Sequence, residues 1–180
     1  MMDEVKQVLL SRVYDVAIES PLTRAPKLSA ASRVDVYLKR EDLQSVHSFK
    51  LRGAYNRIVN LTAEERRRGI IAASAGNHAQ GVGLSAKKLG IRATIVMPKT
   101  TPAIKVEAVR SHGAEVALVG DSFSDAYSYA MSLIDQSGAT FIHPFDDPMV
   151  IAGQGTVGKE VLEQLSGVTH IFVPVGGGGL

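Results

Sequence analysis

The 180-residue sequence contains no cysteine, which excludes a disulfide framework and a zinc site with thiolate ligands. It also lacks paired histidines, since no two of its five histidines stand three or four residues apart, the spacing that places two metal ligands on one face of a helix. These histidines are His47, His78, His112, His143 and His170. We therefore predict no metal site.

A strong charge of one sign and long apolar runs are missing too. The 20 Lys and Arg residues are balanced by 18 Asp and Glu residues, so the net charge of +2 indicates neither nucleic acid nor an acidic membrane surface as a partner. No apolar run reaches the roughly 20 residues of a membrane-spanning helix. Residues 1–4 lack the basic start and apolar core of a signal peptide. These absences predict a cytoplasmic protein that binds neither membrane nor nucleic acid.

Hydrophobic residues make up 45% of the chain, and from Val34 onward apolar runs alternate with amphipathic stretches. Strands are predicted at 34–38, 70–73, 92–97, 115–119 and 170–175. Helices are predicted at 5–16, 51–61, 62–68 with a capping box of Thr62 and Glu65, 77–89, 102–113, 122–136 and 150–165. This alternation favours an α/β fold with parallel sheets, in which ligands bind beyond the carboxyl ends of the strands.

Lys50 is the first candidate for chemistry. It stands between Phe49 and Leu51 at the predicted start of a helix. A half-buried lysine loses its charge by desolvation and becomes a nucleophilic amine. Taken alone, however, this segment favours a surface lysine whose alkyl chain packs on apolar neighbours while its ammonium group stays in water.

Two loops of small residues follow predicted strands. Residues 74–78 lead into a helix, where converging backbone N–H groups suit a carboxylate or phosphate, although an N-cap at Asn77 and a structural His78 explain the same residues. The glycine run 176–179 exposes successive N–H groups, as a phosphate cradle does, with a flexible linker as the alternative. Its position directly after an apolar run favours the cradle. Residues 153–156 fit either a loop near the site or a tightly packed helix start.

Six segments together resemble the fold-type II pyridoxal-phosphate (PLP) dependent enzymes, the tryptophan synthase β family. They occur in the family's order and read KRED at 39–42, VHSFKLRGAY at 46–55, ASAGNHAQG at 73–81, IVMP at 95–98, PFDDP at 144–148 and GGGGL at 176–180. The resemblance implies a two-lobed α/β fold with parallel-rich twisted sheets flanked by helices. Residues 1–47 and 144–180 would form part of a large lobe that is incomplete in this chain, and 48–143 the small lobe.

The resemblance also implies roles for single residues. Lys50 would carry PLP as a Schiff base and later act as a general base, with Phe49 beside the cofactor ring and Asn77 bonded to the ring's 3-hydroxyl oxygen. The substrate carboxylate would be bound by Ser74, Ala75, Gly76, Asn77 and His78. The cofactor phosphate would be held by Gly176, Gly177, Gly178, Gly179 and the amide of Leu180.

The sequence of residues 46–52 is most similar to that of the threonine dehydratase branch of the family. It implies dehydration and deamination of L-threonine, and of L-serine, to a 2-oxo acid (2-oxobutanoate from threonine) and ammonia in isoleucine biosynthesis. Serine racemase and hydroxyaspartate dehydratase are the alternatives within the family. A nucleotide-binding α/β domain is an alternative of another class, although neither a G-x-G-x-x-G fingerprint with its acidic partner nor a P-loop pattern is present.

We expect the intact protein to be a homo-oligomer, a dimer or tetramer, whose partner is a small-molecule amino-acid substrate. Family members continue beyond the glycine run, where they supply the residue that faces the pyridine nitrogen. We therefore expect the 180-residue chain alone to be an inactive fragment with little or no turnover.

Overall fold

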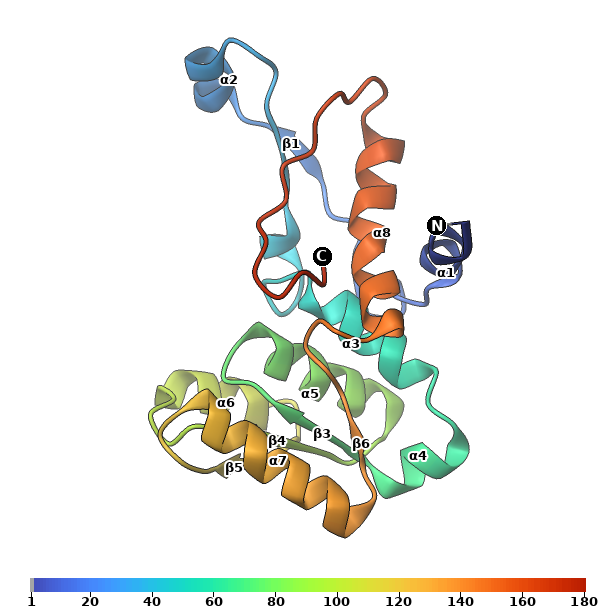
Figure 1. Cartoon of the computed structure of the whole chain (residues 1–180). Helices are drawn as coiled ribbons and strands as arrows, with labels where there is room; N and C mark the ends of the chain where they lie inside the picture. The colour runs from blue at the N-terminus through green and yellow to red at the C-terminus, as the bar shows by residue number, and fades with distance from the viewer. Residues whose placement is uncertain (1) are drawn as a thin grey trace.

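A computed structural model describes residues 2–180, and a parallel sheet forms the centre of its lower part in Figure 1. The sheet has the strand order β5–β4–β3–β6, and every pairing is parallel. The strands are β3 (Ile70–Ala73), β4 (Ala93–Met97), β5 (Glu115–Leu118) and β6 (Thr140–Phe141). The predicted α/β class with a parallel sheet is confirmed.

Both faces of this sheet are covered by helices, which explains why all four residues of β3 are apolar and buried. Ile70 and Ala72 pack in a cluster with helices α3, α5 and α6, whereas Ile71 and Ala73 point to the opposite face and pack on α7. These helices are α3 (Lys50–Val59), α5 (Asn77–Leu89), α6 (Ala103–Arg110) and α7 (Phe123–Ser137).

Helix α3 packs against α5 on one side and against α8 (Pro148–Gln164) on the other. Two glycines permit the close crossing of α3 and α8. A Cβ atom on Gly153 would lie 2.7 Å from the Cα atom of Gly53, and one on Gly53 would lie 2.6 Å from the carbonyl oxygen of Val150. Residues 153–156 therefore belong to a tightly packed helix, one of the two interpretations that the sequence left open.

The upper part in Figure 1 contains a small antiparallel hairpin that projects from the body together with a short helix. Its elements are β1 (Leu22–Arg24), α2 (Pro26–Ser32) and β2 (Tyr37–Lys39), followed by the 3-10 turn η1 (Glu41–Leu43). Helix α1 (Met2–Leu10) lies along α8, and α4 (Ala63–Arg68) begins at the predicted capping box of Thr62 and Glu65. Within residues 2–180, no helix has both the length and the apolar character that crossing a membrane requires.

Three predicted elements differ from the structure. The first helix ends at Leu10 and not at residue 16, because the chain turns to bury Val13 completely. The strand predicted at 34–38 begins only at Tyr37. The strand predicted at 170–175 is wrong: in the described part of the chain this segment pairs with no strand, and Phe172 is 93% exposed. Strand propensity alone does not make a strand, because the backbone needs a neighbouring chain to accept its hydrogen bonds.

Candidate active site

Lys50 opens α3 and is half-buried. Its backbone N–H donates to the Ser48 hydroxyl oxygen over 3.2 Å, and its Nζ donates to the carbonyl oxygen of Pro144 over 2.7 Å. The same Nζ lies 5.4 Å from the centre of the Phe49 ring. Burial lowers the pKa of Lys50 below its usual value. Because burial disfavours the charged ammonium form, the site favours a lysine that gives up its proton readily.

The loop 74–78 lies where β3 ends and α5 begins. The Ser74 N–H continues the sheet by donating to the Val96 carbonyl oxygen over 3.1 Å, and the Gly76 N–H donates to the Ser74 hydroxyl over 3.3 Å. Gly76 is the N-cap of α5, and no side chain caps this helix. The interpretation of Asn77 as an N-cap is therefore wrong. Uncapped N–H groups at a helix start leave a positive end that attracts an anion.

Helix α5 meets α3 at Lys50 itself. A Cβ atom on Gly81 would lie 3.2 Å from the Cα atom of Leu51 and 3.3 Å from the carbonyl carbon of Lys50, so only glycine permits this approach without a shift. Asn77 is exposed and stands four residues before Gly81, which puts both on one face of α5. The crossing thus brings the start of α5 beside the start of α3.

His78 is 3% exposed, and its two ring nitrogens differ. Nε2 lies 2.9 Å from the Ile142 carbonyl oxygen, whereas Nδ1 is buried with no hydrogen-bond partner. Burial, and to a smaller degree the positive charge of Lys50, lowers the pKa of His78 to about 4. The ring is therefore neutral at pH 7, Nε2 carries the hydrogen, and Nδ1 is left as an acceptor. A fully satisfied structural histidine does not describe it.

We expect His78 to make the fold acid-sensitive. Its pKa falls from 6.5 to about 4 on folding, so the unfolded chain takes up a proton first as the pH drops. The contribution of neutral His78 to the free energy of unfolding is then fully present above about pH 6.5, and it falls by about 3 kcal/mol as the pH is lowered to 4. Urea unfolding between pH 7 and pH 4.5 measures the decline. His78→Gln should flatten it, and the exposed His170→Gln should not; equal slopes in all three proteins would contradict the assignment.

The turn at residues 143–146 joins the lysine to the glycine run. The His143 Nδ1 accepts the N–H of Phe145 over 3.3 Å and that of Asp146 over 2.7 Å. Pro144 supplies the carbonyl that holds Lys50, and the adjacent Phe145 lies directly against the glycine run 176–179. Two segments that are about 130 residues apart in the sequence therefore meet at neighbouring residues of one turn.

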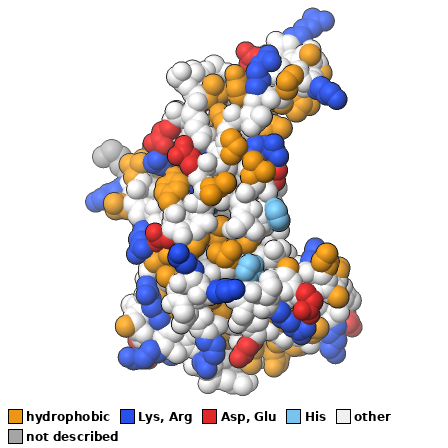
Figure 2. Space-filling model, turned by 180° about the vertical axis from the view of Figure 1, so that it is seen from behind, with side chains coloured by type: hydrophobic (Ala, Val, Ile, Leu, Met, Phe, Trp, Pro, Cys, Tyr) orange, Lys and Arg blue, Asp and Glu red, His pale blue; other side chains and the backbone are white. Residues whose placement is uncertain are grey.

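The predicted site residues thus gather at the starts of α3 and α5, beyond the carboxyl end of β3. Figure 2 shows the molecule narrowing between its sheet-containing part and its upper part, with histidine side chains at that level. Leu180, the exposed last residue, follows the run. The functional role of each of these residues stays a prediction.

A family model described as "Pyridoxal-phosphate dependent enzyme" matches residues 13–180. The chain belongs to this family. Among curated relatives, the biosynthetic L-threonine dehydratase of Burkholderia multivorans is 57% identical over 182 residues, which cover 99% of this chain and 36% of the relative. The chloroplastic biosynthetic threonine dehydratase of Arabidopsis thaliana is 59% identical over 180 residues, with 99% and 30% covered. The chain spans about a third of the length of these relatives.

Solved structures of PLP-dependent enzymes share the fold. The processed form of threonine deaminase isoform 2 from Solanum lycopersicum superposes with a TM-score of 0.96 at 54% identity, covering 99% of this chain and 49% of that one. Maize serine racemase superposes with a TM-score of 0.93 at 34% identity, covering 98% and 54%. The fold is therefore that of the fold-type II PLP-dependent enzymes, as the sequence predicts.

The residues of this member of the PLP-dependent family fit its cofactor. An aldehyde needs an amine that loses its proton readily, and burial lowers the pKa of Lys50. A phosphate needs a backbone without side chains, and Gly176 and Gly178 have no heavy atom within 4 Å of the Cβ position. The Nδ1 of His78, which is close enough to Lys50 for that charge to lower the pKa of His78, is buried and has no hydrogen-bond partner.

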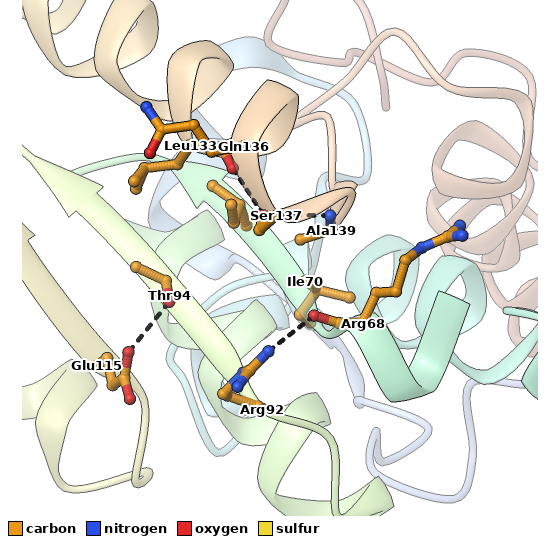
Figure 3. A pocket seen from close by; sticks show the side chains of 10 residues that line it. Arg68, Ile70, Arg92, Thr94, Glu115, Leu133, Gln136, Ser137 and Ala139 are labelled. Carbon is orange, nitrogen blue, oxygen red and sulfur yellow. Dashed lines mark hydrogen bonds between the residues drawn. The ribbon is translucent and has the colours of Figure 1, made fainter. Parts of the chain in front are cut away.

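A pocket of about 250 Å³ lies at the opposite, amino-terminal end of the strands (Figure 3). Its polar groups are engaged with one another: Arg92 donates to the Arg68 carbonyl oxygen over 3.1 Å, and the Thr94 hydroxyl donates to Glu115 over 3.3 Å. Figure 3 shows the Arg68 side chain pointing away from the hollow. Ligands of parallel sheets bind at the carboxyl ends, so this pocket is not the active site of a PLP-dependent enzyme.

Sequence reasoning missed a buried charge network behind Lys50. Arg52 and Glu160 are both fully buried and pair at 2.5 Å. Arg52 also pairs with Glu41 at 2.8 Å, and Lys39 pairs with Glu160 at 2.5 Å. Two positive and two negative groups thus balance and tie α3 to α8, β2 and η1. No local pattern predicts this network, because the partner of Arg52 on α8 is 108 residues away in the sequence. The position of Arg52 two residues after Lys50 is the one signal that connects it with the site.

Proposed function

We propose that the complete protein is a PLP-dependent lyase that dehydrates and deaminates L-threonine, and also L-serine, to a 2-oxo acid and ammonia. The observation that carries this proposal is the position of Lys50. Its amine is held by the Pro144 carbonyl next to the residue that meets the glycine run. The choice of threonine rests on the 57–59% identity to biosynthetic threonine dehydratases, against 34% for serine racemase.

In this proposal the glycine run 176–179 and the Leu180 amide would hold the phosphate of the cofactor. Phe49 would lie beside the cofactor ring, and Asn77 would bond to the ring's 3-hydroxyl oxygen. Bound PLP supplies an electron sink for the bonds at the substrate's α-carbon. The uncapped start of α5, with residues 74–78, binds the substrate carboxylate through its N–H groups, because that helix end is positive.

Lys50 is the proposed general base. When it does not hold the cofactor, its Nζ would remove the α-proton of the substrate. Burial lowers the pKa of this amine, which increases the neutral fraction that accepts a proton at neutral pH. The carbonyl of Pro144 fixes the direction of the Nζ, and neutral His78 adds no competing positive charge beside it. The net reaction converts threonine to 2-oxobutanoate and ammonia.

We also propose that residues 1–47 and 144–180 belong to a large lobe and 48–143 to a small lobe. The four-stranded sheet and the helices that cover it lie within 50–141, which supports this division. We further propose a cytoplasmic homo-oligomer, a dimer or tetramer, that serves isoleucine biosynthesis. The biosynthetic names of bacterial relatives support that setting, whereas the plant relatives are named as chloroplastic.

The test of this function uses the complete protein with PLP. We expect L-threonine to give 2-oxobutanoate faster than L-serine gives pyruvate, with little D-serine formed. Dominant D-serine formation would favour serine racemase, the second candidate, whose structure superposes at a TM-score of 0.93. Tight binding of NAD without binding of PLP would contradict both activities.

A further inference from the structure

We propose that Phe145 is a positioning residue that shapes the glycine run for the cofactor phosphate. In this assignment Gly177 and Gly179 are glycines because Phe145 lies against them, and Gly176 and Gly178 are the glycines left open to a ligand. The inference rests on the proposed function and divides the four glycines into two classes.

The contacts of Phe145 define the first class. A Cβ atom on Gly177 would lie 2.5 Å from both Cγ and Cδ1 of the Phe145 ring. A Cβ atom on Gly179 would lie 2.7 Å from the Phe145 Cβ and 2.9 Å from its carbonyl oxygen. Gly179 is buried by this contact. Non-bonded carbon atoms prefer separations of about 3.5–4.0 Å, so any side chain at these two positions displaces the ring or the run.

The other two glycines face open space. No heavy atom lies within 4 Å of the Cβ position of Gly176 or of Gly178. Gly178 has φ +82°, a backbone conformation that side chains disfavour. Glycines that contact Phe145 therefore alternate along the run with glycines whose Cβ position faces open space.

The ring of Phe145 is held in place by a row of other aromatic rings. Its ring meets that of His143 edge-on, with 4.6 Å between the ring centres, and the His143 ring meets that of Phe141 at 5.9 Å. Phe141 meets Tyr127 of α7 at 5.6 Å. The row of rings thus anchors Phe145 to the sheet-containing part. Because the preceding residue, Pro144, holds the Lys50 amine, this turn sets the position of the amine relative to the glycine run.

The experiment compares the equilibrium affinity of the complete protein for PLP and for pyridoxal, which lacks the phosphate. We expect Phe145→Ala to weaken PLP binding about tenfold or more, equivalent to one charge-assisted hydrogen bond, and to change pyridoxal binding little. Phe145→Tyr keeps the ring and should restore the preference for PLP. Ile104→Ala removes a large apolar side chain that is 80% exposed on α6, away from the glycine run, and is the control.

A size swap tests the contact directly. In the native protein, Gly177→Ala should weaken PLP binding strongly. In the Phe145→Ala variant, where the ring no longer occupies this space, the same substitution should weaken PLP binding by less than about threefold. The effects of substitutions at two residues in contact are not additive. Gly158→Ala, at a glycine whose Cβ would also meet nothing within 4 Å, controls for backbone stiffening. Where Phe145→Ala prevents folding, as judged by circular dichroism, Phe145→Leu replaces it.

Three results would overturn the inference alone: an equal cost of Gly177→Ala in both backgrounds, parallel losses of PLP and pyridoxal affinity, or an unchanged affinity for both compounds in Phe145→Ala. A native protein that binds neither compound would overturn the proposed function and the inference together. Retained preference for PLP in Phe145→Ala, with binding abolished in Lys50→Ala, leaves the function standing and rejects Phe145.

Discussion

Replacement of Lys50 by alanine is expected to abolish the visible absorbance of the lysine-bound cofactor and to reduce threonine turnover by about 10³-fold or more. The reason is that one amine serves twice in the proposed reaction, first to hold PLP and then to move the α-proton. The structure offers this amine a lowered pKa through burial and a fixed direction through the 2.7 Å bond to Pro144. Absorbance spectra and 2-oxobutanoate release in the complete protein measure both effects.

The matched control for this prediction is Lys105→Ala, at an exposed lysine of α6. It should leave the spectrum and turnover as they are. If Lys50→Ala keeps the visible absorbance, another lysine carries the cofactor, and the role assigned to Lys50 is wrong. If the absorbance is lost but turnover persists, Lys50 is not the general base that the reaction requires.

The largest loss of stability is expected from Glu160→Ala. Burial by itself would raise the pKa of Glu160, but hydrogen bonds from Arg52 and Lys39 lower it overall, so the carboxylate is charged in the folded protein. Its removal leaves the fully buried Arg52 with Glu41 as its remaining acidic partner. Breaking a buried pair from one side costs about 3–5 kcal/mol. Urea unfolding with the complete protein and its cofactor measures the cost.

Glu163→Ala is the control on the same helix. Glu163 forms an exposed pair with Lys159 at 2.7 Å, and such pairs contribute about 0.3–0.5 kcal/mol. A double replacement, Arg52→Met with Glu160→Leu, should cost less than Glu160→Ala alone, because it leaves one positive and one negative group of the network, whereas Glu160→Ala leaves two positive groups and one negative group. Equal effects of Glu160→Ala and Glu163→Ala would show that the network contributes little to stability.

Local signals in the sequence were enough to predict several elements well. Helix α5 has the predicted bounds because Gly90, at φ +66°, ends it and the small residues 74–76 precede it. The capping box at Thr62 and Glu65 fixes the start of α4. Buried apolar runs such as 70–73 predict strands correctly, since a sheet covered on both faces needs apolar residues throughout.

Elements and contacts that depend on distant partners could not be predicted. Residues 170–175 have strand composition but no neighbouring strand among residues 2–180. The glycine run was predicted as a phosphate loop, but no local pattern links two of its glycines to Phe145. The network around Arg52 could not be predicted for the same reason, because the sequence does not show which opposite charges the fold brings together.

The same distances in sequence bear on how the protein folds. The lysine helix α3 reaches its native place through contacts to Pro144, 94 residues from Lys50, and to Glu160, 108 residues from Arg52. Contacts this remote in sequence slow folding, because a long loop must close before they stabilise anything. During synthesis α3 and its near partner α5 leave the ribosome long before α8 does. The lysine helix is therefore made early, but its contacts with Pro144 and α8 are expected to form only when the last third of the chain is present.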